Sequence, residues 1–303
     1  MSNKPQPIIS VIIIGYNAEK SLSLLIQSLQ YQTANSDYYE LIFVDDCSND
    51  TTSTIWNNAV FNVKSKYIRH NKNKGRSASR NSGVTKVKGK YCLFTNSNIA
   101  LPRRWVQGYL DFFSNNPNVI AACGLIHYTS CDKKFEKYLN RHSRGLHLLQ
   151  NCANVPLENV LFANAAIRRD IFENMDGFDE NFKSYGGQEL EFMLRAESLY
   201  GNFVQFCENV CVTRIEHPSF TIHSKRLIKF GENSLPILLT KHSEYFKKEL
   251  KLLGLLKYPS LIVLIKFMCY GGLYLYKIFP NSIIRVLLRF YAISGVLQKK
   301  NQM

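Results

Sequence analysis

The stretch that decides the fold is residues 8–50, which opens with Ile8-Ile9-Ser10-Val11-Ile12-Ile13-Ile14-Gly15-Tyr16-Asn17 and closes with Leu41-Ile42-Phe43-Val44-Asp45-Asp46-Cys47-Ser48-Asn49-Asp50. Each half is a short aliphatic run without polar alternation, which is typical of a strand buried on both faces of a parallel sheet. Between the two runs, residues 21–32 carry apolar side chains at helical spacing. The stretch therefore predicts a strand–helix–strand unit of an α/β protein. Polar residues follow both strands, at the edge where open α/β sheets bind ligands.

The same rhythm continues through the first half of the chain. Apolar spacing predicts helices over 51–62, 76–86 and 105–113 and strands over 66–69, 91–94 and 119–122. The strand over 91–94 opens into the polar cluster Asn96-Ser97-Asn98. Residues 131–150 are basic, and we expect a helical segment that covers the site as a lid. Residues 203–212 are strand-like, and only helices are expected after residue 225.

Length and cysteine content limit the class of protein. A chain of 303 residues can bury one large core, or one core plus an appendage. The 8 cysteines are irregularly spaced and form no CxxC pair. The polar residues 1–7 do not resemble a signal peptide. These features predict reduced, mostly buried thiols in a cytoplasmic protein.

Charge is concentrated in the C-terminal part of the chain. The net charge is +15, and no acidic residue follows Glu249. Basic residues alternate there with aliphatic runs such as 261–265, which favours an anionic membrane surface as partner and argues against nucleic acid.

Residues 258–280 approach the roughly 20 apolar residues that a membrane span requires, but Lys266 lies in their middle. We favour amphipathic helices that lie on the inner face of the cell membrane. A single span, and a buried helical subdomain or dimer surface, remain alternatives.

Several motifs occur together in a fixed order, and over about residues 8–249 the chain resembles a family 2 glycosyltransferase of the GT-A fold. The motifs are residues 11–17, 44–51, 73–75, Arg80-Asn81, Asn164 with Arg168, Gly177-Phe178-Asp179-Glu180, Gly186-Gly187-Gln188-Glu189 and His217. The resemblance implies a mixed, mainly parallel sheet flanked by helices. It places a GT-A catalytic domain at residues 1–222 and leaves residues 223–303 as a basic, apolar helical region associated with the membrane.

The resemblance also implies a nucleotide-sugar donor, most simply a UDP-sugar, at the carboxyl edge of the sheet. Tyr16, with Asn17 beside it, would flank the nucleobase, and Asp46 would accept a hydrogen bond from the uracil imide. Asp46 could instead cap the helix that starts near Thr51, and Tyr16 could be an ordinary buried tyrosine.

Other motif residues are expected around the phosphates and the sugar. Lys74, Gly75 and Arg80 would contact or frame the donor phosphates, although Arg80 could instead be a structural ion-pair residue. Asn164 would shape the acceptor or sugar pocket. Gly187 would let the backbone approach a ligand closely.

The chain departs from the family at the metal site. Members usually carry Asp-x-Asp, whose carboxylates hold Mn²⁺ or Mg²⁺ against the diphosphate. Here the neutral Asn96-Ser97-Asn98 stands in its place, although hard cations prefer charged oxygens. Three interpretations are open. A metal ion persists weakly with Asn98, His217 and the diphosphate. Alternatively, Arg103, Arg104 or the basic residues of 131–144 replace it, or the protein is a binding module without turnover.

The candidate catalytic base also differs by one methylene group. The family commonly has Glu-Asp after Gly-Gly, and this chain has Gln188-Glu189. Glu189 is therefore the predicted general base of an inverting displacement, unless it only complements the helix dipole. Glu191 should point to another face of the helix.

The expected activity is a single sugar transfer. No Gln-x-x-Arg-Trp motif of a processive synthase is present. The acceptor would be a hydroxyl of a glycan or lipid-linked molecule in cell-surface polysaccharide assembly. The alternative is a catalytically silent, membrane-associated binding protein of the same fold.

Overall fold

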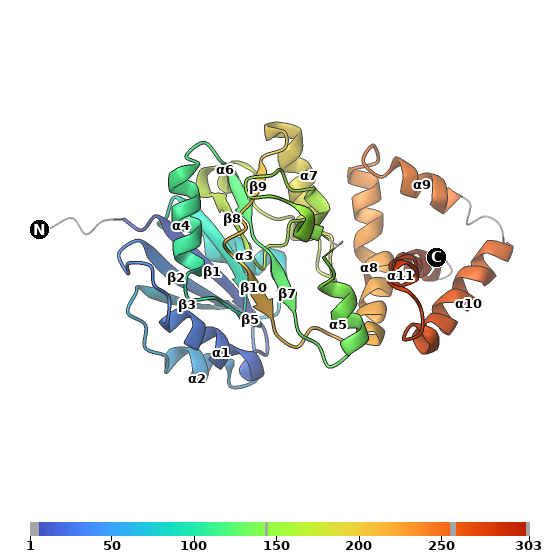
Figure 1. Ribbon diagram of the computed structural model, residues 1–303, viewed down its shortest axis with the longest axis horizontal. Helices are drawn as coiled ribbons and strands as arrows, with labels where there is room; N and C mark the ends of the chain where they lie inside the picture. Colours follow the sequence, from blue (N-terminus) through green and yellow to red (C-terminus); the bar gives the residue numbers. More distant parts are fainter. Residues whose placement is uncertain (1–5, 143–144, 255–258, 301–303) are drawn as a thin grey trace, which may run out of the picture.

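The computed structural model describes residues 6–142, 145–254 and 259–300, and its centre is a seven-stranded sheet (Figure 1). The strands follow the order β3-β2-β1-β4-β8-β6-β9. Strands β1 to β4 run parallel, and β8 runs antiparallel to both of its neighbours. The strand bounds are β1 (Ile9–Gly15), β2 (Tyr39–Asp45), β3 (Ser65–Arg69), β4 (Tyr91–Asn96), β6 (Ala121–Cys123), β8 (Ala165–Arg168) and β9 (Val204–Phe206).

A second, smaller sheet lies beside the end of β4. It has three short strands in the order β5 (Ile99–Ala100), β10 (Val212–Arg214) and β7 (Ile126–Tyr128). The residues that follow β4 therefore enter a different sheet at once. This places Asn96 and Asn98 between the two sheets.

Helices connect the strands and cover the main sheet. The helices of the sheet-bearing part are α1 (Glu19–Gln30), α2 (Thr52–Asn57), α3 (Arg76–Val84), α4 (Trp105–Asn115), α5 (Lys133–Leu139), α6 (Arg169–Asn174) and α7 (Gln188–Tyr200), with 3-10 turns at Gly145–Leu148 and Leu157–Asn159. Two apolar clusters fill the two faces of the sheet. One contains side chains of α1 and α4, and the other contains side chains of α6 and α7. The predicted α/β class is confirmed.

Three segments differ from the prediction. The helix expected over 51–62 ends at Asn57. The strand expected over 203–212 is two strands, β9 in the main sheet and β10 in the small one. The helix expected over 131–150 is divided into α5 and the 3-10 turn Gly145–Leu148. Helix α5 ends where the Asn140 side chain pairs with both backbone groups of Tyr128. Residues 143 and 144 of that predicted lid lie outside the described residues.

The C-terminal helices lie together on one side of the sheet-bearing part (Figure 1). They are α8 (Phe220–Lys241), α9 (Lys247–Gly254), α10 (Pro259–Leu275) and α11 (Asn281–Lys300). Helices α8 and α11 cross almost backbone to backbone, since a Cβ atom on Gly231 would lie 1.8 Å from the Ala292 carbonyl oxygen. A larger residue at position 231 would force the two helices apart.

Side chains of α8, α10 and α11 belong to the same apolar cluster as one face of the main sheet. The ring of Phe220 stacks on Tyr276 with 4.2 Å between the centroids. The Tyr276 hydroxyl donates to Asp132 at the start of α5. Helix α8 begins at Phe220, so residues 222 and 223 are consecutive residues of one helix. Within the described ranges, every helix is too short or too polar to cross a membrane.

Candidate active site

The register of three parallel strands brings the predicted donor-binding segments to one edge. Gly15 of β1 pairs with Asp45 of β2, and Ile14 pairs with Asn96 of β4. The segments that follow these strands therefore lie side by side. They line a pocket of about 540 Å³, the edge pocket. Its walls include Tyr16, Asn17, Asp46, Gly75, Arg76, Asn96, Asn98, Lys183, Tyr185, Arg214, Glu216 and Arg226.

The two residues after β1 have different roles in this wall. Tyr16 is 50% exposed, so the alternative of an ordinary buried tyrosine is wrong. Asn17 has a positive φ of 48°. Its Oδ1 accepts from the Asn49 N–H, and its own N–H donates to the Ser48 hydroxyl. Asn17 thus ties the turn after β1 to the turn after β2, while Tyr16 presents its ring to the pocket.

Asp46 organises the loop that precedes α3. Its Oδ1 accepts from His70 Nδ1 at 2.7 Å and from the Lys74 N–H at 2.8 Å, and its Oδ2 accepts from the Gly75 N–H at 2.8 Å. The capping alternative for Asp46 is wrong, because Asp50 accepts from the Thr52 N–H at the start of α2. Asp46 lines the pocket but already receives three hydrogen bonds from this chain.

The two residues after Asn73 differ in their access to the pocket. Gly75 lies in the wall with φ of 90°, a conformation that favours glycine. The Lys74 side chain is exposed and lies outside the lining of the edge pocket. Its backbone N–H, and not its ammonium group, joins the site through Asp46.

The predicted base lies in an adjoining pocket of about 210 Å³, the helix pocket. Glu189 is in the first turn of α7, and its carboxylate is 20% exposed. The Glu189 Oε1 accepts from Arg80 Nη2 at 2.6 Å. Arg76, Asn96, Tyr185 and Arg214 line both the helix pocket and the edge pocket. The donor-side wall and the predicted base are therefore contiguous.

Arg80 forms the structural ion pair that was one of its two predicted roles. Its side chain is 1% exposed, and its guanidinium lies 5.2 Å from the centroid of Phe178 and 5.7 Å from that of Phe162. Burial lowers the pKa of Arg80, and the charge of Glu189 opposes that decrease. Arg80 therefore reaches the site through Glu189 and not through a pocket wall of its own.

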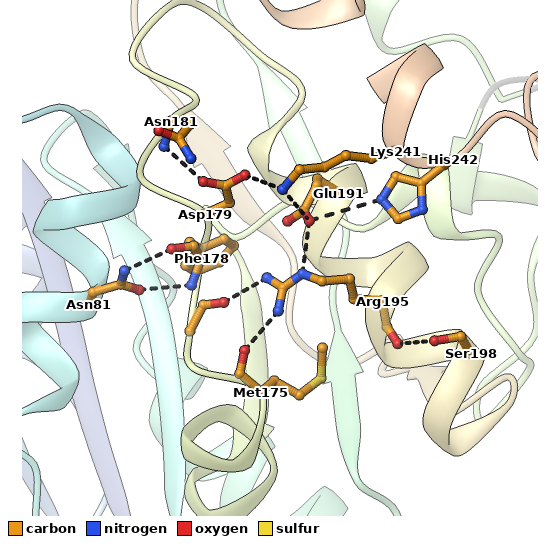
Figure 2. A network of polar contacts seen from close by, with 11 residues as sticks. Asn81, Met175, Phe178, Asp179, Asn181, Glu191, Arg195, Ser198, Lys241 and His242 are labelled. Atoms are coloured by element: carbon orange, nitrogen blue, oxygen red, sulfur yellow. Dashed lines mark hydrogen bonds and ion pairs between the residues drawn. The ribbon is translucent and has the colours of Figure 1, made fainter. Parts of the chain in front are cut away.

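Glu191 faces another side of α7, as predicted, because Glu189 pairs with Arg80 and Glu191 pairs with Arg195. Figure 2 shows the separate network of Glu191. Its fully buried Oε1 accepts from Arg195 Nε at 2.8 Å and lies 3.7 Å from Lys241 Nζ. Arg195 also donates to the carbonyl oxygens of Met175 and Gly177. This network fastens the 175–181 loop and the end of α8 to α7. Glu191 thus fixes the helix that presents Glu189.

Position 187 requires glycine for two reasons. Its φ of 93° is in the left-handed region, and a Cβ atom would lie 2.9 Å from the ring of Phe182. Gly187 also lines the helix pocket directly before α7. Its backbone therefore borders the same pocket as Glu189.

Two predicted site residues are directed elsewhere. Asn164 is fully buried, and its Oδ1 accepts from Trp105 and Tyr109 while its Nδ2 donates to the carbonyl oxygens of Leu125 and Val210. Every hydrogen-bonding group of that side chain is used in the core. The predicted role of Asn164 in a sugar or acceptor pocket is therefore wrong.

His217 also lies outside the walls of the edge pocket, although its neighbours Glu216 and Pro218 line it. Its ring packs against Tyr128 and Phe135, and its Nδ1 lies 3.0 Å from the Pro218 carbonyl oxygen. Burial, with repulsion from Arg214, lowers the pKa of His217 to about 3. The ring is a neutral core group, which corrects the predicted metal contact.

The residues at the Asn96-Ser97-Asn98 position do not fit a divalent cation. Among the described residues, no three His, Cys, Asp or Glu side chains converge as metal ligands. Asn96 Oδ1 is buried without a hydrogen-bond partner, but it is a single neutral oxygen. Arg76 and Arg214 line the same walls and repel a cation. We therefore assign no step to the predicted Mn²⁺ or Mg²⁺.

The cations that the sequence suggested are not the ones in the pocket. Arg103 and Arg104 are exposed at the start of α4, where Arg104 pairs with Asp111. The arginines in the wall are Arg76, Arg214 and Arg226. Sequence reasoning missed them, although Arg76 follows the Asn73-Lys74-Gly75 motif directly and Arg214 precedes His217 by three positions.

Comparison with known proteins identifies the family. Residues 10–176 match the model of Glycosyl transferase family 2, and the chain belongs to that family. An uncharacterized glycosyltransferase of Haemophilus influenzae is 25% identical over 196 residues, which cover 62% of this chain and 61% of the relative. The chain thus spans less than two thirds of this relative.

Two staphylococcal proteins give further comparisons. Poly(ribitol-phosphate) beta-N-acetylglucosaminyltransferase TarP of Staphylococcus aureus is 32% identical over 111 residues, which cover 36% of this chain and 33% of TarP. The structure of S. aureus TarS residues 1–349 in complex with UDP-GlcNAc matches with a TM-score of 0.58 at 16% identity, and covers 97% of this chain and 90% of that one. The second likeness confirms the GT-A fold.

Proposed function

We propose that this protein is an inverting glycosyltransferase that moves a sugar from a UDP-sugar to a hydroxyl group of a cell-surface polymer or its lipid-linked precursor. The observation that carries the proposal is the contiguity of the edge pocket with the pocket of Glu189. A donor whose diphosphate lies in the edge pocket would have its anomeric carbon directed toward Glu189. Family membership and the UDP-GlcNAc complex of TarS support this choice of donor.

Each wall has a chemical task in this proposal. Tyr16 offers a ring to the nucleobase, and the Asn96 Oδ1, which lacks a partner, can accept from a sugar hydroxyl. Glu189 removes the proton from the acceptor hydroxyl as that oxygen attacks the anomeric carbon from the side opposite the leaving diphosphate. Arg80 holds Oε1 of that carboxylate in place.

The acceptor would approach through a third cavity, the outer pocket, of about 380 Å³. Glu158 and Leu161 line both the outer pocket and the helix pocket. Arg141 and Arg285 also line the outer pocket. Positive charge on this side suits an acceptor that carries phosphate groups. The poly(ribitol-phosphate) named for TarP is therefore the first acceptor to test.

The C-terminal helices would hold the protein on the inner face of the cell membrane. Helix α10 and the residues after it expose one apolar stripe, formed by Val263, Phe267, Tyr270, Tyr274 and Ile278. Lys266 and Lys277 are exposed beside this stripe. Apolar side chains at the acyl boundary with lysines at the headgroups would give peripheral attachment.

The experiment that tests the proposal is a transfer assay with the full chain. UDP release from UDP-GlcNAc and UDP-glucose is followed with and without poly(ribitol phosphate), and the product is sized for added sugar. We expect acceptor-dependent UDP release. The missing Asp-x-Asp favours a second candidate, a silent binding protein, and UDP-sugar binding without release or hydrolysis would support that alternative.

A further inference from the structure

Three guanidinium groups in the edge pocket lack carboxylate partners. Arg76 begins α3, Arg214 ends β10, and Arg226 lies in the second turn of α8. None of them takes part in an ion pair within the described ranges, whereas Arg80 beside them is paired with Glu189. The Nε atom of Arg214 is buried without a hydrogen-bond partner. Such donors are costly unless a ligand satisfies them.

The acids near these arginines do not neutralise them. Asp46 is occupied by His70 and two backbone N–H groups. Glu189 is held by Arg80. Glu216 lines the edge pocket but is exposed and forms no ion pair among the described residues. The edge pocket therefore carries a net positive charge.

The arginines also repel one another. Loss of hydration, followed by the charges of Arg214 and Arg80, lowers the pKa of Arg76 to about 10, and the charge of Glu189 opposes only part of that decrease. Tyr185 contacts two of the guanidinium groups, since its ring centroid lies 5.8 Å from Arg76 Cζ and 5.6 Å from Arg226 Cζ. An aromatic ring thus holds two cations close together, and neither cation forms an ion pair with a carboxylate in the described ranges. Such an arrangement suits a multiply charged anion.

We propose that Arg76, Arg214 and Arg226 bind the donor diphosphate and stabilise its leaving charge in place of a divalent cation. This inference rests on the proposed nucleotide-sugar donor. Guanidinium groups suit the task because each presents several donors in a plane that matches phosphate oxygens. As the bond between the anomeric carbon and the β-phosphate oxygen breaks, its electron pair remains on that oxygen. The three charges then stabilise the diphosphate.

One of the three charges comes from the C-terminal region. Arg226 lies on α8, whereas Arg76 and Arg214 belong to the sheet-bearing part. The Lys241 end of the same helix pairs with Asp179 in the 175–181 loop and with Glu191 on α7 (Figure 2). The C-terminal helices therefore contribute a side chain to the donor site, in addition to any attachment of the protein to a membrane.

The test is calorimetric titration of UDP into the full chain, once with Mn²⁺ and once with excess chelator. We expect the same affinity in both conditions and a decrease in affinity as salt is added. Arg76→Gln and Arg226→Gln should each weaken UDP binding by about tenfold or more, the loss of one charge-assisted contact. Arg103→Gln is the matched control and should bind as the parent does.

A second pair of variants retains the arginines and changes the amides. In Asn96→Asp/Asn98→Asp, new negative charge should weaken UDP binding in chelator, and Mn²⁺ should restore part of the affinity. Mn²⁺-dependent binding by the unaltered chain would overturn the inference but leave the proposed donor intact. Unchanged binding by both arginine variants would also overturn the inference. If the unaltered chain binds UDP neither with Mn²⁺ nor with excess chelator, both proposals are overturned.

Discussion

Arg80 Nη2 lies 2.6 Å from Glu189 Oε1, and this contact joins α3 to the first turn of α7 across 109 positions of sequence. The arginine is buried between Phe162 and Phe178, and the glutamate is partly open to the helix pocket. One end of the pair is therefore fixed in the core while the other can meet a substrate. The pair gives the candidate base a defined position.

Substitution of the candidate base should separate binding from chemistry. Glu189→Gln keeps the shape of the side chain but cannot accept a proton, so transfer should decrease by about a hundredfold or more. UDP affinity should remain within about twofold, because the Glu189 carboxylate is paired with Arg80 and forms no ion pair with the proposed phosphate-binding arginines among the described residues. Calorimetry and the transfer assay measure the two quantities. Glu197→Gln, on a later turn of α7, is the control, and near-normal turnover in Glu189→Gln would remove Glu189 from its role.

Loss of the buried partner should lower stability as well as activity. Arg80→Met leaves Glu189 without its cation, and breaking a buried pair costs about 3 kcal/mol of unfolding free energy, the low end of the usual range because Glu189 retains some solvent. Urea denaturation followed by circular dichroism provides the measurement. Arg104→Met breaks an exposed pair with Asp111 and should cost less than about 1 kcal/mol. Equal costs for the two variants would contradict the structural role of Arg80.

The network of Glu191 should matter for folding and not for donor affinity. Glu191→Gln removes the negative charge that Arg195 and Lys241 both contact. We expect the free energy of unfolding to decrease by about 3 kcal/mol. At low temperature, where the variant stays folded, UDP binding should match the parent. Glu173→Gln, which alters an exposed pair with Arg169, is the matched control. A stable Glu191→Gln protein that fails to bind UDP would show that this network belongs to the site.

Low pH should remove the contribution of Asp179 to the stability of the folded protein. Burial alone would raise its pKa, but hydrogen bonds from Lys241 and the Asn181 backbone lower the pKa below the ordinary value of 3.8. A carboxylate with a lowered folded-state pKa stabilises the protein above its unfolded pKa and loses that contribution as pH falls through the folded value. The stability difference between parent and Asp179→Asn should thus be constant above about pH 5 and shrink below about pH 4. Denaturation midpoints from pH 3 to pH 7 would reveal this, and a difference independent of pH would refute it.

Membrane attachment should depend on the stripe of α10. Phe267→Asp and Tyr274→Asp place a charge among side chains that are 70% and 68% exposed, so each should reduce co-flotation with anionic vesicles several-fold. Tyr31→Asp alters a tyrosine that is 59% exposed on the sheet-bearing part and should leave flotation unchanged. A comparison with neutral vesicles shows whether Lys266 and Lys277 contribute to membrane binding through their charge. Flotation unaffected by either α10 variant would leave a self-association surface as the better explanation.

Local sequence was enough to predict the sheet and its ligand edge. Residues 9–15 and 39–45 are mostly apolar without polar alternation, which predicts strands buried on both faces, and every position in both strands is buried. Parallel strands place their carboxyl ends together. Local chemistry also predicted Tyr16, Asn17, Gly75 and Asn96 in one wall, because each lies near the carboxyl end of a strand or directly before a helix. The separate directions of Glu189 and Glu191 follow from helical geometry alone.

Tertiary structure decided which side chains face that wall. The sequence suggested Asn164 and His217 from their positions in motifs, but whether a polar side chain turns to a pocket or to the core depends on partners far along the chain, such as Trp105 for Asn164. Arg76, Arg214 and Arg226 come from a helix, a strand of the small sheet and a C-terminal helix, and no local pattern links them. They converge only because the fold brings α3, β10 and α8 to the same pocket. The sequence by itself determined where a donor would lie, and only the packed fold decided which charges would meet it.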